Sequence, residues 1–199
     1  MNKIRCIIFD VGGVIVSESI DPVYGALNKK IGKRLFNRKD ILHRKLLTGK
    51  MTENEFYEKT SKKSGRTKKA LKEMVVSEYL KYKTLNKGVL KIARSLKIRG
   101  YKTAILSNVI PEHKKLNLKI GAYRNFSTLI LSCDVKCRKP ERKIFRIALD
   151  RLHAKPSECV FIDDRKEFLE TPGKLGMKTI RFRNASQLRR DLKKLGVNI

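Results

Sequence analysis

The sequence predicts an α/β protein with a doubly wound, parallel, five-stranded Rossmann-like sheet and a small all-helical cap. Short apolar runs alternate with helical stretches along most of the chain, and that order is typical of this class. Most of the runs are continuously apolar, which indicates parallel strands covered on both faces. Residues 17–88 interrupt the alternation, because they contain helical patterns and no convincing strand.

The apolar runs place the five strands. The expected strands are Ile4–Phe9, Thr103–Ser107, Thr128–Leu131, Val160–Asp163 and Thr179–Phe182. Where the alternation resumes, apolar residues from Val89 to Leu96 recur at helical spacing, and Gly100 follows where a helix would end. Similar helical patterns cover residues 144–152 and 187–195.

The remaining helical segment is an insertion. Residues 54–63 and 68–81 carry helical patterns within it. It follows the first strand directly, at the edge where an α/β sheet binds its ligand. We therefore expect an α/β core domain of residues 1–16 and 89–199, and a helical cap domain of residues 17–88.

The chain is strongly basic. Its 199 residues include 48 Lys and Arg against 19 Asp and Glu, a formal charge of +29. The excess is spread evenly, since residues 17–88 hold 19 basic and 8 acidic residues and residues 89–199 hold 27 and 10. An even spread favours a solvated basic surface, whereas nucleic-acid binding usually concentrates charge on one face. A preference for phosphorylated ligands or nucleic acid stays open.

Cysteine usage and hydropathy bear on the compartment. Cys6, Cys133, Cys137 and Cys159 form no Cys-x-x-Cys pair, so we expect four reduced thiols and a cytoplasmic protein. The N-terminus has no signal-peptide pattern, and no run of about 18 apolar residues predicts a membrane span. Monomer and homodimer both stay open.

Two strand ends carry candidate ligand groups. Asp10 ends the first strand and is followed by Gly12 and Gly13, which let the backbone turn sharply beside a ligand. Ser107 ends the second, where its hydroxyl and the backbone N–H of Asn108 could bind a phosphoryl oxygen. Each pattern taken alone is also typical of an ordinary turn.

Two later segments complete the pattern. Lys139 precedes Pro140, the expected first residue of a helix, and its ammonium could neutralise a buried anion or lie on the surface. Asp163 and Asp164 end the fourth strand, and adjacent carboxylates there need a cation nearby. Such oxygen ligands suit Mg²⁺, although an Asp in this place can also cap a helix.

The order of these residues, Asp, then Ser, then Lys, then Asp-Asp at successive strand ends, resembles the haloacid dehalogenase superfamily of hydrolases. The resemblance covers essentially the whole chain and is strongest over residues 131–145, 161–165 and 175–177. It points to the phosphatase-like branch with a helical cap after the first motif.

That resemblance implies a Mg²⁺-dependent phosphatase acting on a small phosphorylated metabolite through an aspartyl phosphate. The family's nucleophile matches Asp10, and its phosphate-binding residues match Ser107, with Asn108 beside it, and Lys139. The implied metal ligands are Asp10, the backbone carbonyl of Gly12, Asp163 and Asp164.

The sequence departs from the family pattern at three positions. Gly12 stands where phosphatases of the family usually carry an acid/base Asp. Phe168 replaces a usual Asn or Asp, and Pro172 replaces a small helix former. A weakly active or non-catalytic protein that binds phosphorylated ligands or nucleic acid is therefore an alternative. A metal-independent dehalogenase is less favoured, because the Asp163–Asp164 pair indicates a metal.

Overall fold

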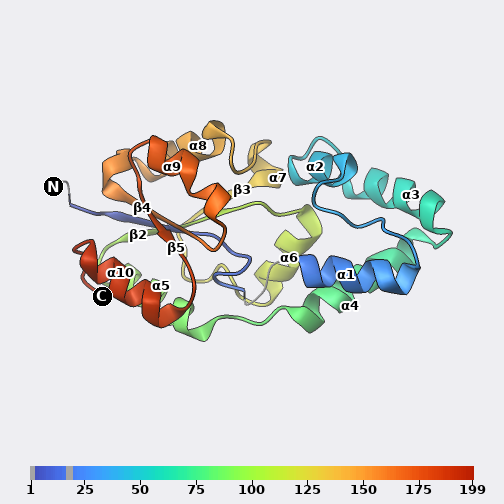
Figure 1. The fold of residues 1–199 in the computed structure, drawn as a ribbon, viewed down its shortest axis with the longest axis horizontal. Helices are drawn as coiled ribbons and strands as arrows, with labels where there is room; N and C mark the ends of the chain where they lie inside the picture. The colour runs from blue at the N-terminus through green and yellow to red at the C-terminus, as the bar shows by residue number, and fades with distance from the viewer. Residues whose placement is uncertain (1–2, 17–19) are drawn as a thin grey trace.

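A five-stranded parallel sheet forms the centre of the computed structural model, which describes residues 3–16 and 20–199 (Figure 1). The strands are β1 (Cys6–Phe9), β2 (Lys102–Ser107), β3 (Thr128–Leu131), β4 (Cys159–Asp163) and β5 (Lys178–Arg181). They are ordered β3-β2-β1-β4-β5, and every neighbouring pair is parallel. The predicted fold class is confirmed.

Alternate residues of the strands face opposite layers of helices, as expected from the two-residue repeat of a strand. From β1, Ile7 and Phe9 join the hydrophobic cluster that includes apolar residues of α5 (Lys87–Ile98) and α10 (Ala185–Lys194). Cys6 and Ile8 join the cluster that includes α8 (Arg142–Leu152). Figure 1 shows α5 and α10 on one face of the sheet and α8 on the other. The central strands β1 and β4 are therefore buried on both faces, which explains their nearly continuous apolar runs, whereas the edge strand β5 is mostly exposed.

Strand register brings the candidate residues to one edge. Phe9 pairs with Ile105 of β2 and with Ile162 of β4, so Asp10 follows β1 at the level where β2 and β4 end. Shorter elements complete this domain: α6 (Pro111–Lys119), α7 (Ser132–Val135), η1 (Pro156–Glu158), η2 (Lys166–Phe168) and α9 (Glu170–Lys174). The helix after Lys139 begins at Arg142, two residues later than the predicted start at Pro140.

Between β1 and α5, the described residues form four helices. They are α1 (Asp21–Ile31), α2 (Ile41–Leu47), α3 (Glu53–Ser64) and α4 (Lys68–Tyr82). Thr52 and Glu55 form a capping box at the start of α3, and the Thr67 hydroxyl caps α4, which explains where these helices begin. The exact division into a core and a cap of residues 17–88 stays a prediction, and residues 17–19 lie outside the described part of the chain.

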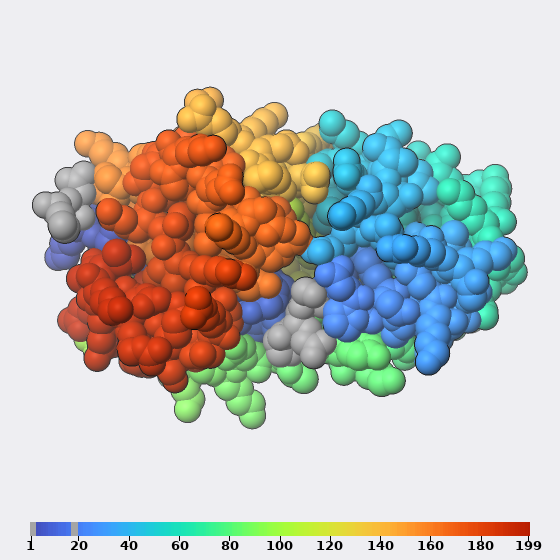
Figure 2. Space-filling view, viewed as in Figure 1, coloured from blue at the N-terminus to red at the C-terminus, as the bar shows by residue number. Residues whose placement is uncertain are grey.

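These four helices have a hydrophobic cluster of their own, including Leu27, Leu46 and Leu71. Ile110, just before α6, joins this cluster and so connects it to the sheet domain. Figure 2 shows the blue and cyan surface of α1–α3 packed directly against the yellow and orange surface of the sheet domain.

Buried polar contacts also attach the inserted helices to α6. The Tyr57 hydroxyl donates to the Glu112 carboxylate, and the Tyr79 hydroxyl donates to Asn117 Oδ1 at 2.7 Å. Burial raises the pKa of Glu112. These contacts fix the inserted helices above the carboxyl edge of the sheet.

All four cysteines are free thiols, as predicted. Within residues 3–16 and 20–199, no helix combines the length and the apolar character that a membrane span needs.

Candidate active site

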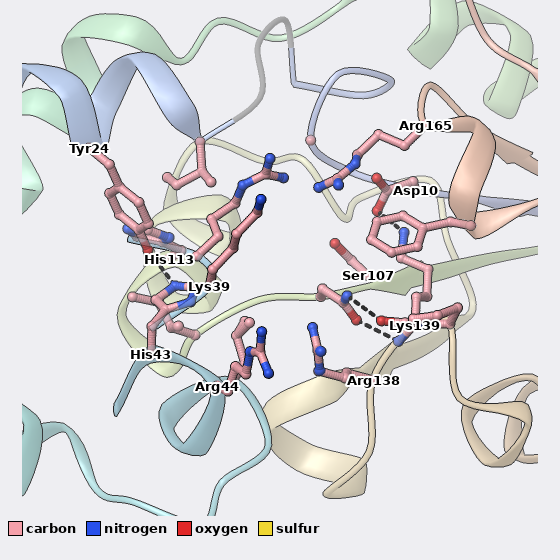
Figure 3. Close-up of a pocket in the computed structure, with 18 of the residues that line it drawn as sticks. Asp10, Tyr24, Lys39, His43, Arg44, Ser107, His113, Arg138, Lys139 and Arg165 are labelled. Carbon is pink, nitrogen blue, oxygen red and sulfur yellow. Dashed lines mark hydrogen bonds and ion pairs between the residues drawn. The ribbon is translucent and has the colours of Figure 1, made fainter. Parts of the chain in front are cut away.

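A cavity of about 300 Å³ lies between the carboxyl edge of the sheet and the inserted helices (Figure 3). The predicted site residues Asp10, Gly12, Ser107, Asn108, Lys139 and Asp164 all line it. Asp163 does not line the cavity and is completely buried behind it. The structure therefore brings the predicted residues of four separate segments to one place.

Lys139 is the centre of the charged cluster. Its Nζ lies 2.8 Å from Asp10 Oδ1 and 2.6 Å from Asp163 Oδ2, and its side chain is 1% exposed. Burial alone would lower the pKa of Lys139, but the two carboxylates raise it above its ordinary value. The ammonium therefore stays charged and offsets the repulsion between the two acids.

Neighbouring side chains fix the position of Lys139. The Asn108 side-chain amide donates to the Lys139 carbonyl at 3.0 Å and accepts from the Lys139 N–H at 2.8 Å. The rings of Phe161 and Phe168 lie 5.5 and 4.9 Å from Lys139 Nζ, within cation–π distance. Phe168, which departs from the family pattern, thus supports the lysine. The side chain of Asn108 positions Lys139. The backbone N–H of Asn108 stays available for the predicted phosphoryl contact.

The two adjacent carboxylates differ in their surroundings. Asp163 accepts from Lys139 through Oδ2 and from the Arg165 backbone N–H through Oδ1 at 2.9 Å. Asp164 Oδ1, by contrast, is buried and has no hydrogen-bond partner among the described residues. Burial, and secondly the charge of Asp10, raises the pKa of Asp164 to about 6. A buried carboxylate oxygen without a partner is costly, so Asp164 Oδ1 is a candidate ligand for a cation.

The donor set fits a divalent cation. Asp10, Asp163 and Asp164 each offer a carboxylate oxygen, and these oxygens lie within 4.8 Å of one another. Carboxylate oxygens are hard ligands of the kind that Mg²⁺ prefers. Gly12 lines the cavity beside them, and its carbonyl as a further ligand stays a prediction.

Comparison with known proteins identifies the family. The family model for haloacid dehalogenase-like hydrolases matches residues 4–167. The chain belongs to this family. The expected superfamily is thereby confirmed, and the match includes every predicted site residue.

Curated relatives of this haloacid dehalogenase-like hydrolase have several activities. It is 32% identical over 149 residues to bifunctional epoxide hydrolase 2 of Mus musculus, covering 71% of this chain and 27% of that protein. It is 34% identical over 82 residues to flavin mononucleotide hydrolase 1 of Arabidopsis thaliana, covering 41% and 33% respectively. The alignments with the epoxide hydrolases thus span much less than two thirds of those proteins.

Solved structures share the fold over nearly the whole chain. A haloacid dehalogenase-like family hydrolase from Porphyromonas gingivalis superposes with a TM-score of 0.83 at 23% identity, with 100% of each chain covered. A family enzyme from Bacteroides thetaiotaomicron, in complex with magnesium and inorganic phosphate, superposes with a TM-score of 0.76 at 22% identity, covering 91% of this chain and 95% of that one. At these identities the likeness establishes the fold.

The rest of the cavity is lined by residues that the sequence analysis did not assign to the site. Its further cationic residues are Arg38, Lys39, Arg44, Arg138 and Arg165, and Tyr24, His43 and His113 form the wall opposite Asp10 (Figure 3). Arg138 and Arg165 could have been predicted as lining residues, because they are adjacent in sequence to the predicted site residues Lys139 and Asp164. Nothing distinguished the cations at 38, 39 and 44 in a chain with 48 basic residues.

Proposed function

We propose that this hydrolase is a Mg²⁺-dependent phosphatase that acts on a small phosphorylated metabolite through an aspartyl-phosphate intermediate. The observation that carries the proposal is the cluster of Asp10, Asp163 and Asp164 around Lys139, in which Asp164 Oδ1 is buried without a partner among the described residues. A phosphoryl group and a divalent cation would together satisfy these charges. The cavity of about 300 Å³ limits the substrate to a small molecule.

In the proposed reaction, Asp10 is the nucleophile. Lys139 binds Asp10 Oδ1, and this contact orients the carboxylate so that its other oxygen can attack phosphorus. The new Asp10–phosphorus bond forms as the bond from phosphorus to the leaving oxygen breaks. Water then attacks the phosphorus of the aspartyl phosphate, releasing inorganic phosphate and regenerating Asp10.

Other residues stabilise the transferring group. Ser107 is 4% exposed and its hydroxyl makes no hydrogen bond to the described part of the chain, so it is available to a phosphoryl oxygen. Lys139 and the backbone N–H of Asn108 would neutralise further oxygen charge. Asp10, Asp164 and the Gly12 carbonyl would hold Mg²⁺, while Asp163 chiefly holds Lys139. When bound, Mg²⁺ supplies positive charge that offsets the charge of the phosphoryl oxygens.

Gly12 favours a second candidate, a weakly active protein that mainly binds phosphorylated ligands. No side chain at this position can protonate a leaving group or activate water. We rank metal-independent dehalogenation lower, because it would leave the buried Asp164 oxygen unsatisfied. Nucleic acid as a ligand and a cytoplasmic location stay predictions.

The test is hydrolysis of an activated aryl phosphate, which needs little help with leaving-group protonation. Turnover with Mg²⁺ that stops on chelation and returns on adding Mg²⁺ supports the phosphatase. Absence of turnover at every Mg²⁺ concentration contradicts it and favours the binding protein.

A further inference from the structure

Beyond the phosphoryl site, the cavity is strongly cationic. Its only acidic lining residues in the described part of the chain are Asp10 and Asp164, and both belong to the phosphoryl and metal end. The five cations at positions 38, 39, 44, 138 and 165 line the remainder. This imbalance is local to one partly open cavity, in which Lys39 and Arg44 are exposed, so it differs from the even spread of charge over the chain.

Existing ion pairs occupy only some of these cations. Arg38 pairs with Asp21 at 2.8 Å, and Arg165 pairs with Glu167. Arg138 lies 4.0 Å from Glu141. Lys39 and Arg44 form no ion pair with the residues that the structure describes.

The unpaired cations occupy a defined place in the cavity. Figure 3 shows Lys39, Arg44 and Arg138 between the wall that holds Asp10 and Lys139 and the opposite wall. Lys39 precedes α2 and Arg44 lies on it, so both come from the inserted helices, whereas Arg138 comes from the sheet domain. Cations from both the inserted segment and the sheet domain therefore line the part of the cavity next to Lys139.

The opposite wall contains further polar atoms without partners. His43 Nδ1 and His113 Nε2 are buried and make no hydrogen bond among the described residues, and both side chains line the cavity. The Tyr24 hydroxyl lies 2.6 Å from the other ring nitrogen of His43. Burial lowers the pKa of His43 to about 4, so this wall offers neutral hydrogen-bonding groups. Buried polar atoms in this state indicate a polar ligand.

We infer that the substrate is a doubly anionic small molecule, in which the reacting phosphate and a second phosphate or carboxylate are joined by a short spacer. Lys39 and Arg44, assisted by Arg138, bind the second anionic group. This inference rests on the proposed function for the identity of the reacting end. The cationic middle of the cavity would give such a molecule both affinity and orientation.

The test compares two matched probes. They are 3-carboxybenzylphosphonate and the neutral amide, 3-carbamoylbenzylphosphonate, which have nearly the same shape and cannot be hydrolysed. Calorimetry in the presence of Mg²⁺ gives the affinity of the protein for each. We expect the carboxylate probe to bind about tenfold more tightly than the amide probe, because its carboxylate can contact both Lys39 and Arg44.

Variants locate the source of that preference. The double variant Lys39→Gln/Arg44→Gln is expected to reduce the preference to about twofold or less, since both unpaired cations are gone. Lys91→Gln, which removes an exposed cation of α5 that does not line the cavity, should leave the preference unchanged. Equal affinity for the two probes, or an undiminished preference in the double variant, would overturn the inference.

A parallel assay separates this inference from the proposed function. The corresponding aryl phosphates, 3-carboxyphenyl and 3-carbamoylphenyl phosphate, measure turnover. Turnover of both without a binding preference supports the phosphatase and refutes the doubly anionic substrate. A binding preference without turnover of either refutes the phosphatase and retains the anion-binding site.

Discussion

Gly13 and Asp164 approach so closely that no side chain fits between them. A β-carbon at Gly13 would lie 2.6 Å from the Asp164 carboxyl carbon, and Gly13 has a φ of +80°. Both the contact and the left-handed backbone favour glycine. The turn after β1 thus allows Asp164 to approach the Asp10 cluster.

Gly13→Ala should therefore weaken Mg²⁺ binding and activity together. The new methyl group displaces Asp164, and disturbing a metal site in this way typically costs about 10–100-fold in affinity or activity. The measurement is the Mg²⁺ concentration that gives half-maximal turnover of an aryl phosphate. Gly25→Ala is the matched control, because Gly25 lies in α1 and a β-carbon there would meet nothing within 4 Å. Unchanged Mg²⁺ dependence in Gly13→Ala would contradict the role of this contact.

Replacing the buried lysine should affect stability as well as activity. Lys139→Met leaves Asp10 and Asp163 without their shared cation, and breaking such a buried pair costs about 3–5 kcal/mol. Urea unfolding at pH 7 measures this loss, and Lys91→Gln serves as the surface control. Wild-type stability with retained turnover in Lys139→Met would show that the cation is dispensable.

Gly12 predicts a steep dependence on the leaving group. Without a proton donor at this position, aryl phosphates should be hydrolysed much faster than alkyl phosphates. Gly12→Asp should raise alkyl-phosphate kcat/KM by up to about 10²-fold, whereas Gly12→Asn, of similar size but unable to donate that proton, should not. If the wild type hydrolyses both classes equally well, another group supplies the proton.

The central strands β1 and β4 were predictable because they are buried throughout and mostly apolar, whereas most residues of the edge strand β5 are exposed. The predicted limits of β3 match the structure, and the other predicted limits differ from it by at most two residues, as at β1, where the apolar run begins at Ile4 and the strand at Cys6. Strand ends depend on backbone pairing, which composition does not specify.

The placement of Asp10, Ser107 and Asp164 around one cavity could be anticipated from their positions at the ends of parallel strands, whereas Lys139 reaches it from the loop after α7, eight residues beyond the end of β3. Their individual contacts could not, because they depend on segments distant in sequence. Asn108 binds the Lys139 backbone across 31 residues, and Phe168 packs its ring beside the lysine. The sequence also could not show which cations of the inserted segment line the cavity, because that depends on tertiary packing.

Acid should destabilise the fold through His113. This residue is 5% exposed and stacks on Tyr79 at 4.3 Å. Burial, with smaller effects of His43 and Lys83, holds the pKa of His113 well below its usual value of about 6.5. The unfolded chain therefore binds the extra proton, so the contribution of His113 is complete above about pH 6.5 and is lost as the pH falls.

His113→Phe keeps an aromatic ring against Tyr79 but cannot bind a proton. Below about pH 6.5, the free energy of unfolding of the wild type should fall by up to about 1.4 kcal/mol per pH unit more than that of the variant. His153→Asn, at an exposed position after α8, is the control and should follow the wild type. Parallel curves for His113→Phe and wild type would refute the prediction.

The most direct measurement is the mass of the protein during turnover. Acid quenching of the wild type in the presence of Mg²⁺ and an aryl phosphate, followed by peptide mapping, should place a phosphoryl group on Asp10. Asp10→Asn should carry none and should not turn over, because no other carboxylate occupies that position. Undiminished hydrolysis by Asp10→Asn, or a phosphoryl group trapped on a different residue, would contradict Asp10 as the nucleophile.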